Sequence, residues 1–313
     1  MAGEPTTWNW TTSSACSAAA GDALFSAPRE PRGMQVVTLG PAGTYSHRAA
    51  GSIADDGVSF RESVTEIVAA VADGEFDRGV VPVENSIEGS VDESLDALAD
   101  REVSVVQEVV SPIRHALLAQ GPEFSTVASH PQALAQCREY LAEQYPDVSQ
   151  EAVASTARGV ERARDDPSVA AIGHPANAGS SAQGADEDSD DTLQRIAENI
   201  QDHDSNATRF LVVAPESERS EAGGKTSIVA YPGANYPGLL LELLESFADR
   251  DINLTRIESR PSGRRLGDYC FHVDIEAGLY EARTQEALAE IEAVCADGWV
   301  KRLGSYDTTH VVG

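Results

Sequence analysis

The amino-acid sequence predicts an α/β protein in which a larger domain of alternating strands and helices precedes a smaller βαββαβ domain. From residue 36 to about residue 214, short apolar runs rich in β-branched residues alternate with segments of helical periodicity. Residues 215–224 are polar and rich in Gly, show no apolar periodicity, and are typical of a linker. After them the elements follow the order strand, helix, strand, strand, helix, strand, which is typical of a ferredoxin-like unit. The length of 313 residues allows two or three domains.

The first domain is predicted to begin with a short apolar strand directly after Met34. Its further strands are apolar β-branched runs, and its helices are segments in which apolar residues recur every three to four positions. The predicted strands are residues 36–39, 79–83, 103–110, 169–172 and 210–213, and the predicted helices are residues 46–54, 65–73, 91–99, 131–145 and 156–164.

The second domain has two amphipathic segments between its predicted strands. The first of them opens with Pro237, a residue that helices accept in their first turn. Ser262 and Gly263 are predicted to form the turn between the second and third strands. The predicted strands are residues 226–231, 252–260, 267–275 and 299–305, and the predicted helices are residues 236–250 and 280–294.

Two segments are predicted to lie outside the folded domains. Residues 1–33 are rich in Ala, Ser, Thr, Gly and Pro, lack periodicity, and are predicted to be a disordered tail. Residues 186–191 form an acidic run that is typical of a solvated loop; a cation site is the alternative. No apolar stretch reaches the ~18 residues of a membrane span, and the N-terminus lacks the features of a secretory signal, so we expect a cytoplasmic protein.

The charge balance is strongly acidic. The chain has 51 Asp and Glu residues against 23 Lys and Arg residues, which gives a formal net charge of −28. Acids spread along the whole chain indicate a highly solvated surface, as in proteins of a high-salt cytoplasm; an ordinary acidic protein is the alternative. Nucleic-acid binding is disfavoured because no basic stripe is present to neutralise phosphates. The four cysteines show no metal-ligand spacing, and no dinucleotide or Walker motif occurs, so we expect no metal and no cofactor.

Polar residues follow the predicted strands at several points, and ligands of α/β proteins bind at the carboxyl ends of strands. Thr44 and Ser46 follow the first strand in a Gly-rich turn, where they could bind a carboxylate or simply cap a helix. Glu84, Asn85 and Ser86 follow the second strand, where Asn85 and Ser86 could donate to an anion and Glu84 could accept from a hydroxyl. A plain helix cap before residue 91 is the alternative for this second group.

Three further segments have the same character. His130 stands before a Pro-initiated helix and is either a proton donor or, as its residue type favours, a histidine bound to backbone. Ser155 and Thr156 again place hydroxyls between a strand and a helix. Thr208 and Arg209 immediately precede the strand at 210–213; Arg209 could bind a carboxylate with its guanidinium fork or pair with a surface acid.

In this order, these segments resemble the prephenate dehydratase family. The family's GPxGTxS, PxENSxxGxV, HPQALxQC, STA and NxTRF blocks correspond to residues 40–46, 82–91, 130–137, 155–157 and 206–210. The ESRP block of its regulatory ACT domain corresponds to residues 258–261. The resemblance covers residue 36 to about residue 305, and six ordered blocks make it specific.

The resemblance implies an enzyme with two α/β lobes, like a type II periplasmic binding protein, followed by a ferredoxin-like βαββαβ ACT domain. Lobe one would be residues 34–110 with 192–214, lobe two residues 111–191, and the ACT domain residues 225–313. The enzyme would convert prephenate to phenylpyruvate, water and CO2 without a cofactor, and its motifs would meet in the cleft between the lobes. The tail is too short for the long helices of the chorismate mutase that some relatives carry.

The resemblance also implies site residues. Thr208 matches the family's essential threonine and is predicted to donate to the departing ring hydroxyl. The other residues implied for catalysis are Arg209, Glu84, Asn85 and Ser86, and those implied for substrate binding are Thr44, Ser46, His130, Gln132, Ser155, Thr156, Ala157 and Phe210.

Family members are usually dimers or tetramers with L-phenylalanine bound between ACT domains as a feedback inhibitor, so we expect a homodimer or homotetramer. Leu239 stands where the family usually has Ala, and Gly267 stands where an aromatic residue is usual; both changes bear on phenylalanine affinity. Arogenate dehydratase is the nearest alternative, and a non-catalytic amino-acid sensor is the alternative from another class, which the presence of Thr208 disfavours. The residues implied for phenylalanine binding are Asn235, Gly238, Leu239, Leu240, Asn253, Leu254, Glu258, Ser259, Arg260 and Pro261.

Overall fold

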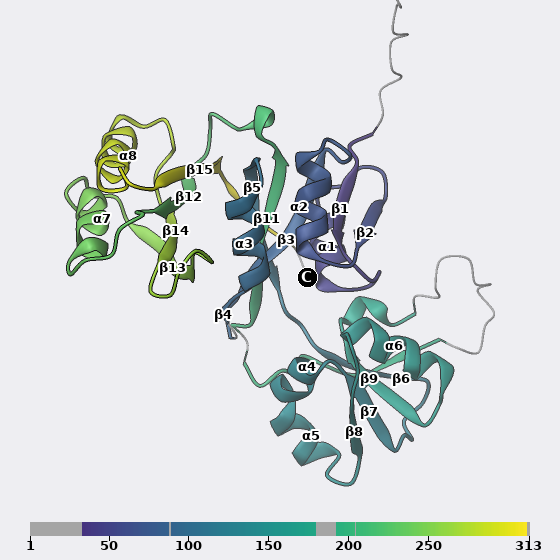
Figure 1. Cartoon of the computed structure of the whole chain (residues 1–313). Helices are drawn as coiled ribbons and strands as arrows, with labels where there is room; N and C mark the ends of the chain where they lie inside the picture. The colour runs from purple at the N-terminus through teal and green to yellow at the C-terminus, as the bar shows by residue number, and fades with distance from the viewer. Residues whose placement is uncertain (1–32, 88, 180–191, 204, 312–313) are drawn as a thin grey trace, which may run out of the picture. The chain divides into compact units, whose positions relative to one another are not determined.

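A computed structural model describes residues 33–87, 89–179, 192–203 and 205–311 of the chain (Figure 1). The strands within these ranges form three sheets. The predicted tail, except for Gly33, and the predicted acidic loop at 186–191 lie outside the described residues. None of the helices in this part of the chain combines the length and the apolar character needed to cross a membrane.

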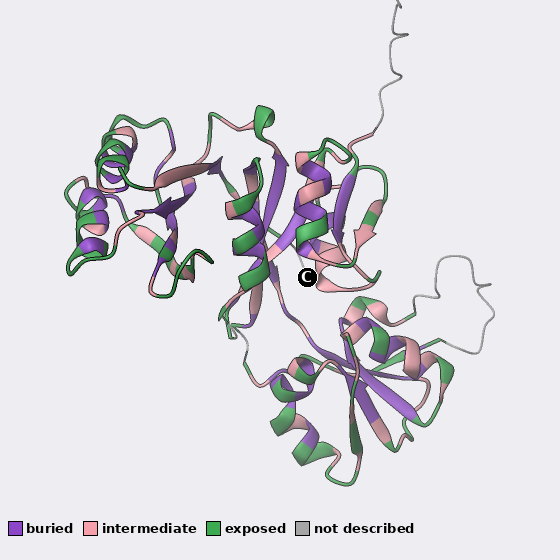
Figure 2. Cartoon of the chain, viewed as in Figure 1, coloured by how far each residue is buried: buried purple, intermediate pink, exposed green. Residues whose placement is uncertain are grey.

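The first lobe is built on a mixed sheet with the strand order β16-β5-β11-β3-β1-β2, and β4 lies beside β3. β1 pairs in parallel with β2 and β3, whereas β11 runs antiparallel to both β3 and β5. No residue of β1, β3, β5 or β11 is exposed, and most of them are buried (Figure 2), which explains their near-continuous apolar sequences. The strands are β1 (Val36–Leu39), β2 (Val58–Arg61), β3 (Arg78–Asn85), β4 (Gly89–Ser90), β5 (Val103–Pro112), β11 (Ala207–Pro215) and β16 (Thr308–His310).

Helices α1 (Tyr45–Gly51), α2 (Val64–Ala72) and α3 (Asp92–Asp100) belong to this lobe. The start of α2 is fixed by two hydrogen bonds: the hydroxyl of the N-cap residue Ser63 accepts from the Glu66 amide at 3.2 Å, and the Glu66 carboxylate accepts from the amide of the preceding residue, Glu62, at 3.1 Å. The apolar side of α2 is fully buried against the sheet because its apolar residues recur at helical spacing.

The second lobe has its own sheet, with the strand order β10-β6-β9-β7-β8. β7 pairs in parallel with β8 and β9, and β10 forms an antiparallel edge on β6. Its elements are β6 (Ala116–Ala119), β7 (Thr126–Ser129), α4 (Pro131–Gln136), α5 (Arg138–Gln144), β8 (Ser149–Ala152), α6 (Thr156–Asp165), β9 (Val169–Gly173), the 3₁₀ turn η1 (Pro175–Asn177) and β10 (Gln194–Glu198).

Two predictions for this region need correction. The predicted helix at 131–145 is two helices, because Cys137 leaves the helical region with φ −119° and ψ 20° and breaks the run. The predicted return to lobe one at residue 192 comes too early, since β10 pairs with β6 and belongs to lobe two. The chain therefore passes between the lobes at residues 113–115 and again at residues 199–206.

The C-terminal domain has the predicted βαββαβ order, with the antiparallel sheet β13-β14-β12-β15. Together with the two lobes, it confirms the predicted fold class. Pro237 lies before its first helix and not inside it: Gly238 caps the helix with φ 96°, and the helix begins at Leu239. After the 3₁₀ turn η2 (Glu216–Glu218), the elements are β12 (Lys225–Tyr231), α7 (Leu239–Ala248), β13 (Leu254–Pro261), β14 (Tyr269–Ile275), α8 (Ala282–Val294) and β15 (Trp299–Tyr306).

Both faces of the C-terminal sheet are buried along its central strand β12, each against a different partner. Alternate residues such as Ile228 and Val273 pack with α7 and α8. The other face contributes Val229, Tyr231 and Cys270 to the same apolar cluster as the core of the first lobe. The alternation of side chains along the strands thus lets one sheet contribute both to its own core and to the junction with the first lobe.

Two backbone features fix this junction. Gly304 in β15 approaches β5 so closely that a Cβ on it would lie 2.3 Å from the Val105 carbonyl oxygen. Beyond β15 the chain returns to the first lobe, where β16 pairs in parallel with β5. Residues 308–310, predicted as part of the C-terminal domain, therefore belong to the first lobe's sheet.

Candidate active site

A cavity of about 330 Å³ is lined by residues of both lobes. The first lobe contributes the turn between β1 and α1 and the ends of β3 and β11. The second lobe contributes the starts of α4 and α6, and the crossing segment after β5 adds two side chains. The lining residues are Leu39, Gly40, Thr44, Tyr45, Ser46, Pro82, Asn85, Ile113, His115, His130, Gln132, Ala133, Gln136, Ala154, Ser155, Thr156, Thr208 and Phe210.

Thr208 and Asn85 lie directly opposite each other on the paired strands β11 and β3. The Asn85 Nδ2 atom donates to the Thr208 hydroxyl oxygen at 3.1 Å, while its Oδ1 atom accepts from the Ile87 amide at 3.0 Å. The second contact fixes which end of the Asn85 amide faces Thr208. Because the Thr208 oxygen accepts from Asn85, its own proton is available to donate into the cavity.

The Asn85–Thr208 pair is continued by a chain of polar side chains across the lobe junction. Asn85 Nδ2 also lies 3.4 Å from Asn206 Oδ1, and Asn206 Nδ2 donates to Gln136 Oε1 at 2.9 Å. His115 Nε2 lies 2.9 Å from the same Gln136 oxygen, which can only accept, so Nε2 carries the ring proton. Burial lowers the pKa of His115, against a smaller raising effect of Gln136, and favours the neutral ring.

Tyr45 closes the chain at the far side. Its hydroxyl donates to the Arg114 carbonyl at 2.6 Å and lies 3.4 Å from the second nitrogen of His115. Burial, and to a lesser degree the nearby Cys137, raise the pKa of Tyr45, which keeps the phenol protonated. Burial thus favours the uncharged forms of both His115 and Tyr45.

Gln136 has one unsatisfied donor. Its Nε2 atom is buried and has no hydrogen-bond partner among the described residues. A buried amide without a partner costs about 1–3 kcal/mol, and Gln136 is also one of the residues that line the cavity.

The cavity wall carries no Lys, Arg, Asp or Glu side chain among its lining residues. Its polar atoms are hydroxyls, amides and imidazoles, with backbone amides at the starts of helices. Such a wall can bind carboxylates through many uncharged donors, and it gives an acidic chain a site without nearby negative charge.

Three lining residues also cap helices. The Thr44 oxygen accepts from the His47 amide at 3.2 Å, His130 Nδ1 from the Gln132 amide at 3.3 Å, and the Ser155 oxygen from the Arg158 amide at 3.1 Å. The structure therefore shows the helix-capping role that was the alternative for Thr44. It also shows the backbone-bound role that was favoured for His130. The Nε2 atom of His130 is left as the ring atom that can face a ligand.

The position of Ser155 and Thr156 depends on a glycine. A Cβ on Gly159 would lie 2.5 Å from the Ala128 carbonyl oxygen, so α6 packs directly on β7. This close approach brings the start of α6 beside that of α4, and both line the cavity. Ala157, predicted to bind substrate, is not among the lining residues; it is buried beneath the helix start.

Three predicted catalytic residues are placed away from the cavity. Arg209 follows Thr208 on β11, and Glu84 precedes Asn85 on β3. Because side chains alternate along a strand, Arg209 and Glu84 point to the opposite face of the sheet. There Arg209 pairs with Glu108 and Asp274, and Glu84 lies 3.6 Å from Arg256. These positions correct the prediction that Arg209 and Glu84 contact the substrate.

Ser86 is tied to the neighbouring strand. Its hydroxyl donates to the Ser205 carbonyl at 3.1 Å and accepts from the Ala207 amide at 2.9 Å. It is exposed and does not line the cavity, so its prediction as an anion ligand is corrected as well. Its contacts instead fix the start of β11, next to Thr208.

The residues predicted to bind phenylalanine are spread over the C-terminal domain. Leu240 lines a small apolar pocket with Phe247, Ile257 and Phe271. Glu258 accepts from the Ser90 hydroxyl at 2.6 Å, and Arg260 pairs with Asp92 at 2.6 Å and Asp96 at 2.9 Å, so both contact the first lobe. Two asparagines make hydrogen bonds within the domain: the Asn235 side chain donates to the Gly267 carbonyl, and the Asn253 side chain donates to Glu276. Leu239 is buried and Leu254 packs on the domain core. Ser259 and Pro261 pair with β14.

Sequence reasoning did not select Tyr45, His115, Gln136 or Asn206 as site residues. Gln136 and Asn206 lie within the sequence blocks 130–137 and 206–210 that resemble the family. Their amide side chains, which can both donate and accept hydrogen bonds, could have marked them as site residues. His115 lies in a segment without a motif, and its role depends on the crossing of the chain between lobes. Among the described residues, no cluster of His, Cys, Asp or Glu could hold a metal ion.

The fold and the cavity define a class of protein: a two-lobed α/β domain that encloses a small-molecule site of uncharged donors, joined to a βαββαβ domain. The family model for prephenate dehydratase matches residues 36–218. The chain belongs to the prephenate dehydratase family.

Individual relatives agree over most of the chain. It is 37% identical over 283 residues to a prephenate dehydratase of Amycolatopsis methanolica, covering 87% of this chain and 88% of that protein. It is 36% identical over 277 residues to the enzyme of that name from Methanocaldococcus jannaschii, covering 85% and 95%. A solved structure of prephenate dehydratase from Arthrobacter aurescens in complex with L-Phe is similar, with a TM-score of 0.78, 32% identity, and coverage of 88% and 90%.

Proposed function

We propose that this chain converts prephenate to phenylpyruvate, water and CO2 in the cavity between its lobes, with Thr208 facing the ring hydroxyl that departs. The observation that carries this proposal is the Asn85–Thr208 hydrogen bond at the cavity wall. It leaves the Thr208 proton to be donated toward a ligand, at the meeting point of both lobes.

The reaction breaks two bonds of the substrate ring. The ring carboxylate leaves as CO2, and the electrons of its bond to the ring complete the aromatic system as the C–O bond to the hydroxyl breaks. The hydroxyl leaves as water with one proton taken from solvent, so the prephenate dianion and that proton give the phenylpyruvate anion, CO2 and water. Hydroxide is a poor leaving group, so Thr208 assists by donating a hydrogen bond to the departing oxygen, and a threonine hydroxyl is too weak an acid to supply the proton outright. Orientation and preorganised dipoles supply the rest of the acceleration.

The two carboxylates of the substrate are held by uncharged donors in this proposal. Ser46, Gln132, Thr156 and Gln136 all line the cavity. Charged side chains would bind a dianion more strongly in the ground state, whereas neutral donors do not resist the loss of the ring carboxylate as neutral CO2.

Further parts of this proposal concern regulation, oligomeric state, location and salt dependence. The C-terminal domain acts as an ACT domain that binds L-phenylalanine as an effector in a homodimer or homotetramer, by analogy with the relative solved with L-Phe. The protein is cytoplasmic, and it works in high salt because its net charge of −28 repels itself and an anionic substrate unless the charge is screened.

The test measures phenylpyruvate formation from prephenate in multimolar KCl, with arogenate in parallel and with and without phenylalanine. Thr208→Ala is compared with Thr208→Ser, which keeps the hydroxyl. We expect the Ala variant to lose about 10²–10³-fold in kcat and the Ser variant to keep most activity. A folded Thr208→Ala variant with near-native kcat would overturn the role of Thr208, and absence of turnover by the unmodified chain would overturn the activity.

A further inference from the structure

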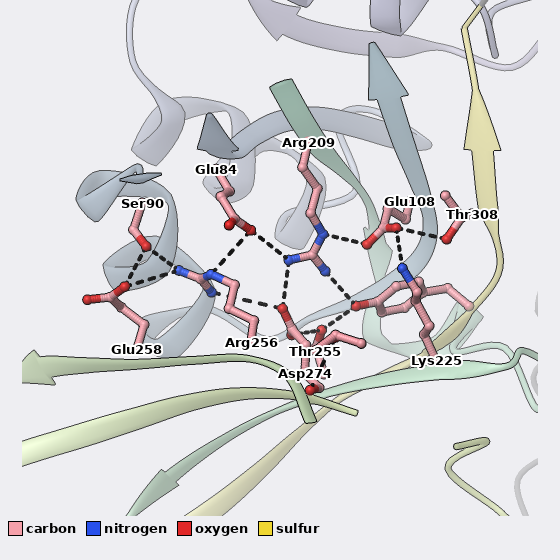
Figure 3. Close-up of polar contacts among 12 residues, drawn as sticks. Glu84, Ser90, Glu108, Arg209, Lys225, Thr255, Arg256, Glu258, Asp274 and Thr308 are labelled. Carbon is pink, nitrogen blue, oxygen red and sulfur yellow. Dashed lines mark hydrogen bonds and ion pairs between the residues drawn. The ribbon is translucent and has the colours of Figure 1, made fainter. Parts of the chain in front are cut away.

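Thr208 and Arg209 are neighbours on β11, and they face opposite sides of the sheet. Thr208 lies on the cavity wall, while Arg209 reaches into the junction between the first lobe and the C-terminal domain (Figure 3). The same holds on β3, where Asn85 faces the cavity and Glu84 faces the junction. The pair that carries the proposed chemistry therefore has a charged pair directly behind it.

The Arg209 guanidinium is held on three sides (Figure 3). Its Nε atom pairs with Glu108 of β5, its Nη1 atom lies 2.6 Å from Asp274 of β14, and its Nη2 atom donates to the Tyr306 hydroxyl at 3.0 Å. Two of these three partners, Asp274 and Tyr306, belong to the C-terminal domain. Only 14% of the Arg209 side chain is exposed, so these contacts replace water around the cation.

The acids that hold Arg209 are themselves buried and shared. The Glu108 side chain, 1% exposed, also pairs with Lys225 at 2.7 Å and accepts from Thr308 at 2.8 Å. The Asp274 side chain, 5% exposed, also accepts from the Ser227 hydroxyl. Separating any two of these partners would leave a charge buried without its counter-charge, which is strongly unfavourable. The cluster therefore resists small displacements.

The charges behave as a coupled set. Burial alone would lower the pKa of the Arg209 guanidinium, but Asp274, Tyr306 and Glu108 outweigh it and raise that pKa. Burial would likewise raise the pKa of Glu108, but Arg209, Lys225 and Thr308 outweigh it and lower the pKa. Arg209 and Glu108 therefore keep their charges at neutral pH.

The pairing of β3 with β11 is irregular next to Asn85 and Thr208. Arg209 pairs with Glu84 but Phe210 pairs with Pro82, so Val83 is an extra residue on β3, whereas β11 keeps a continuous register with β5 from Ala207 to Val212. A bulge twists the strand that contains it and re-aims its side chains, so this ladder alone fixes Asn85 less firmly opposite Thr208. Arg209 is the side chain at that irregularity, and it is anchored from the other domain.

We propose that Arg209 and Asp274 are positioning residues for the dehydration: their ion pair fixes β11 so that Thr208 meets Asn85 and faces the substrate. The inference rests on the proposed role of Thr208. It makes the C-terminal domain part of the catalytic apparatus even without an effector, because that domain supplies Asp274.

The test compares Asp274→Asn, Arg209→Gln and Arg209→Lys with the unmodified full-length chain, all in the same KCl concentration. Asp274→Asn keeps the shape of the side chain and removes its charge. We expect kcat to fall about tenfold or more in Asp274→Asn and Arg209→Gln, with KM changed less than twofold and partial recovery in Arg209→Lys, because the substrate does not touch either residue.

The matched control is Lys301→Gln. Lys301 also joins the C-terminal domain to the first lobe, through the carbonyls of Ala99 and Arg101, but it has no contact with β11. We expect this variant to keep its kcat. If Asp274→Asn and Lys301→Gln changed kcat, KM and melting temperature alike, the ion pair would be only structural and the inference would be overturned.

A double substitution separates positioning from general damage. In a Thr208→Ala background, Asp274→Asn should lower the remaining kcat less than twofold, since the group that it positions is already gone. An unchanged tenfold effect in that background would overturn the inference. Should Asp274→Asn fail to fold, Tyr306→Phe removes one neutral hydrogen bond to Arg209, and an unaltered kcat in that variant would count against the inference too.

The outcomes distinguish the two proposals. A folded Thr208→Ala variant with native kcat overturns the role of Thr208 and this inference with it. An inactive Thr208→Ala variant beside a fully active Asp274→Asn variant overturns this inference alone.

Discussion

Asn85 donates to the Thr208 hydroxyl across two paired strands, with 3.1 Å between the amide nitrogen and the hydroxyl oxygen. The two residues are more than a hundred positions apart in the chain, and the antiparallel register of β3 and β11 brings them together. Because the hydroxyl oxygen accepts from the sheet, the hydroxyl proton stays available to be donated to another group. Four predictions follow from this arrangement and from the packing around it.

Replacement of Asn85 by Asp should reverse the direction of the Thr208 hydroxyl. The substitution keeps the size of the side chain but replaces the donating amide by a carboxylate oxygen, to which Thr208 would donate. A preorganised donor would be lost, and we expect kcat to fall about 10²–10³-fold. Steady-state kinetics with prephenate measures this, with circular dichroism as the check on folding, and a folded variant of native kcat would refute the assigned direction.

Gln136→Glu should weaken substrate use. The change keeps an oxygen for Asn206 and His115 but removes the Nε2 donor of a cavity-lining residue, a donor that has no partner among the described residues. Loss of a donor to a charged ligand group costs about 1.5–3 kcal/mol, so we expect kcat/KM to fall about 10–100-fold. Gln201→Glu is the control, because Gln201 also has a buried unsatisfied Nε2 but does not line the cavity. Equal losses in both variants would contradict a contact with substrate.

His272 should make the protein less stable in mild acid. Burial, and then the nearby Arg256, lower the pKa of His272 from 6.5 to about 4 in the folded chain. Between these values the unfolded chain binds a proton that the folded chain refuses, so the free energy of unfolding falls as pH falls from 6.5 toward 4. For this group alone the loss is about 2 kcal/mol between pH 7 and pH 5.

The measurement is urea unfolding at both pH values, at one KCl concentration, for the unmodified chain and for His272→Leu. Leu cannot bind the proton, so the variant should lose less stability on acidification. An identical pH dependence of the two proteins would show that His272 does not contribute. His174, whose pKa is also lowered to about 4, remains in both proteins and cancels in the comparison.

Gly304→Ala should destabilise the contact between β15 and β5. Gly304 has φ 146°, a conformation that L-residues rarely adopt, and the new Cβ would lie 2.3 Å from the Val105 carbonyl oxygen. Strain and overpacking together should cost about 2 kcal/mol or more. Gly121→Ala is the control, since no atom lies within 4 Å of its added Cβ, and we expect a change within about 0.5 kcal/mol. Equal unfolding midpoints for the two variants would contradict the close approach.

The sequence predicted the elements of the fold well where apolar patterns are strong. The β-branched runs at 79–83 and 103–110 became β3 and β5, each slightly longer than predicted. Short or half-exposed strands were not predicted: β2 has only partly buried or exposed residues, and β10 has no buried residue, so neither shows a clear apolar run. β10 also decided the lobe boundary, and a pairing with β6 cannot be inferred from the strand's own residues.

The site was predicted only in part, for a reason that lies in strand geometry. Thr208 and Asn85 were selected with Arg209 and Glu84 because recognised blocks are contiguous in sequence. Alternation along a strand then sends neighbours to opposite faces, and only one residue of each pair reaches the cavity. Tyr45 and His115 were missed because their contacts depend on tertiary structure: 70 positions separate them in the chain.

The parallel pairing of β16 with β5 makes the C-terminal domain an insertion in the catalytic sheet and not an appendage at its end. The polypeptide leaves that sheet after β11 and rejoins it at β16, so the domain is tethered at both ends. Truncation at the linker would strip an edge strand from the catalytic lobe and expose the hydrogen-bonding groups of β5. Excising residues 225–306 and bridging the gap would keep that edge strand in place, but it would also remove Asp274, the partner of Arg209.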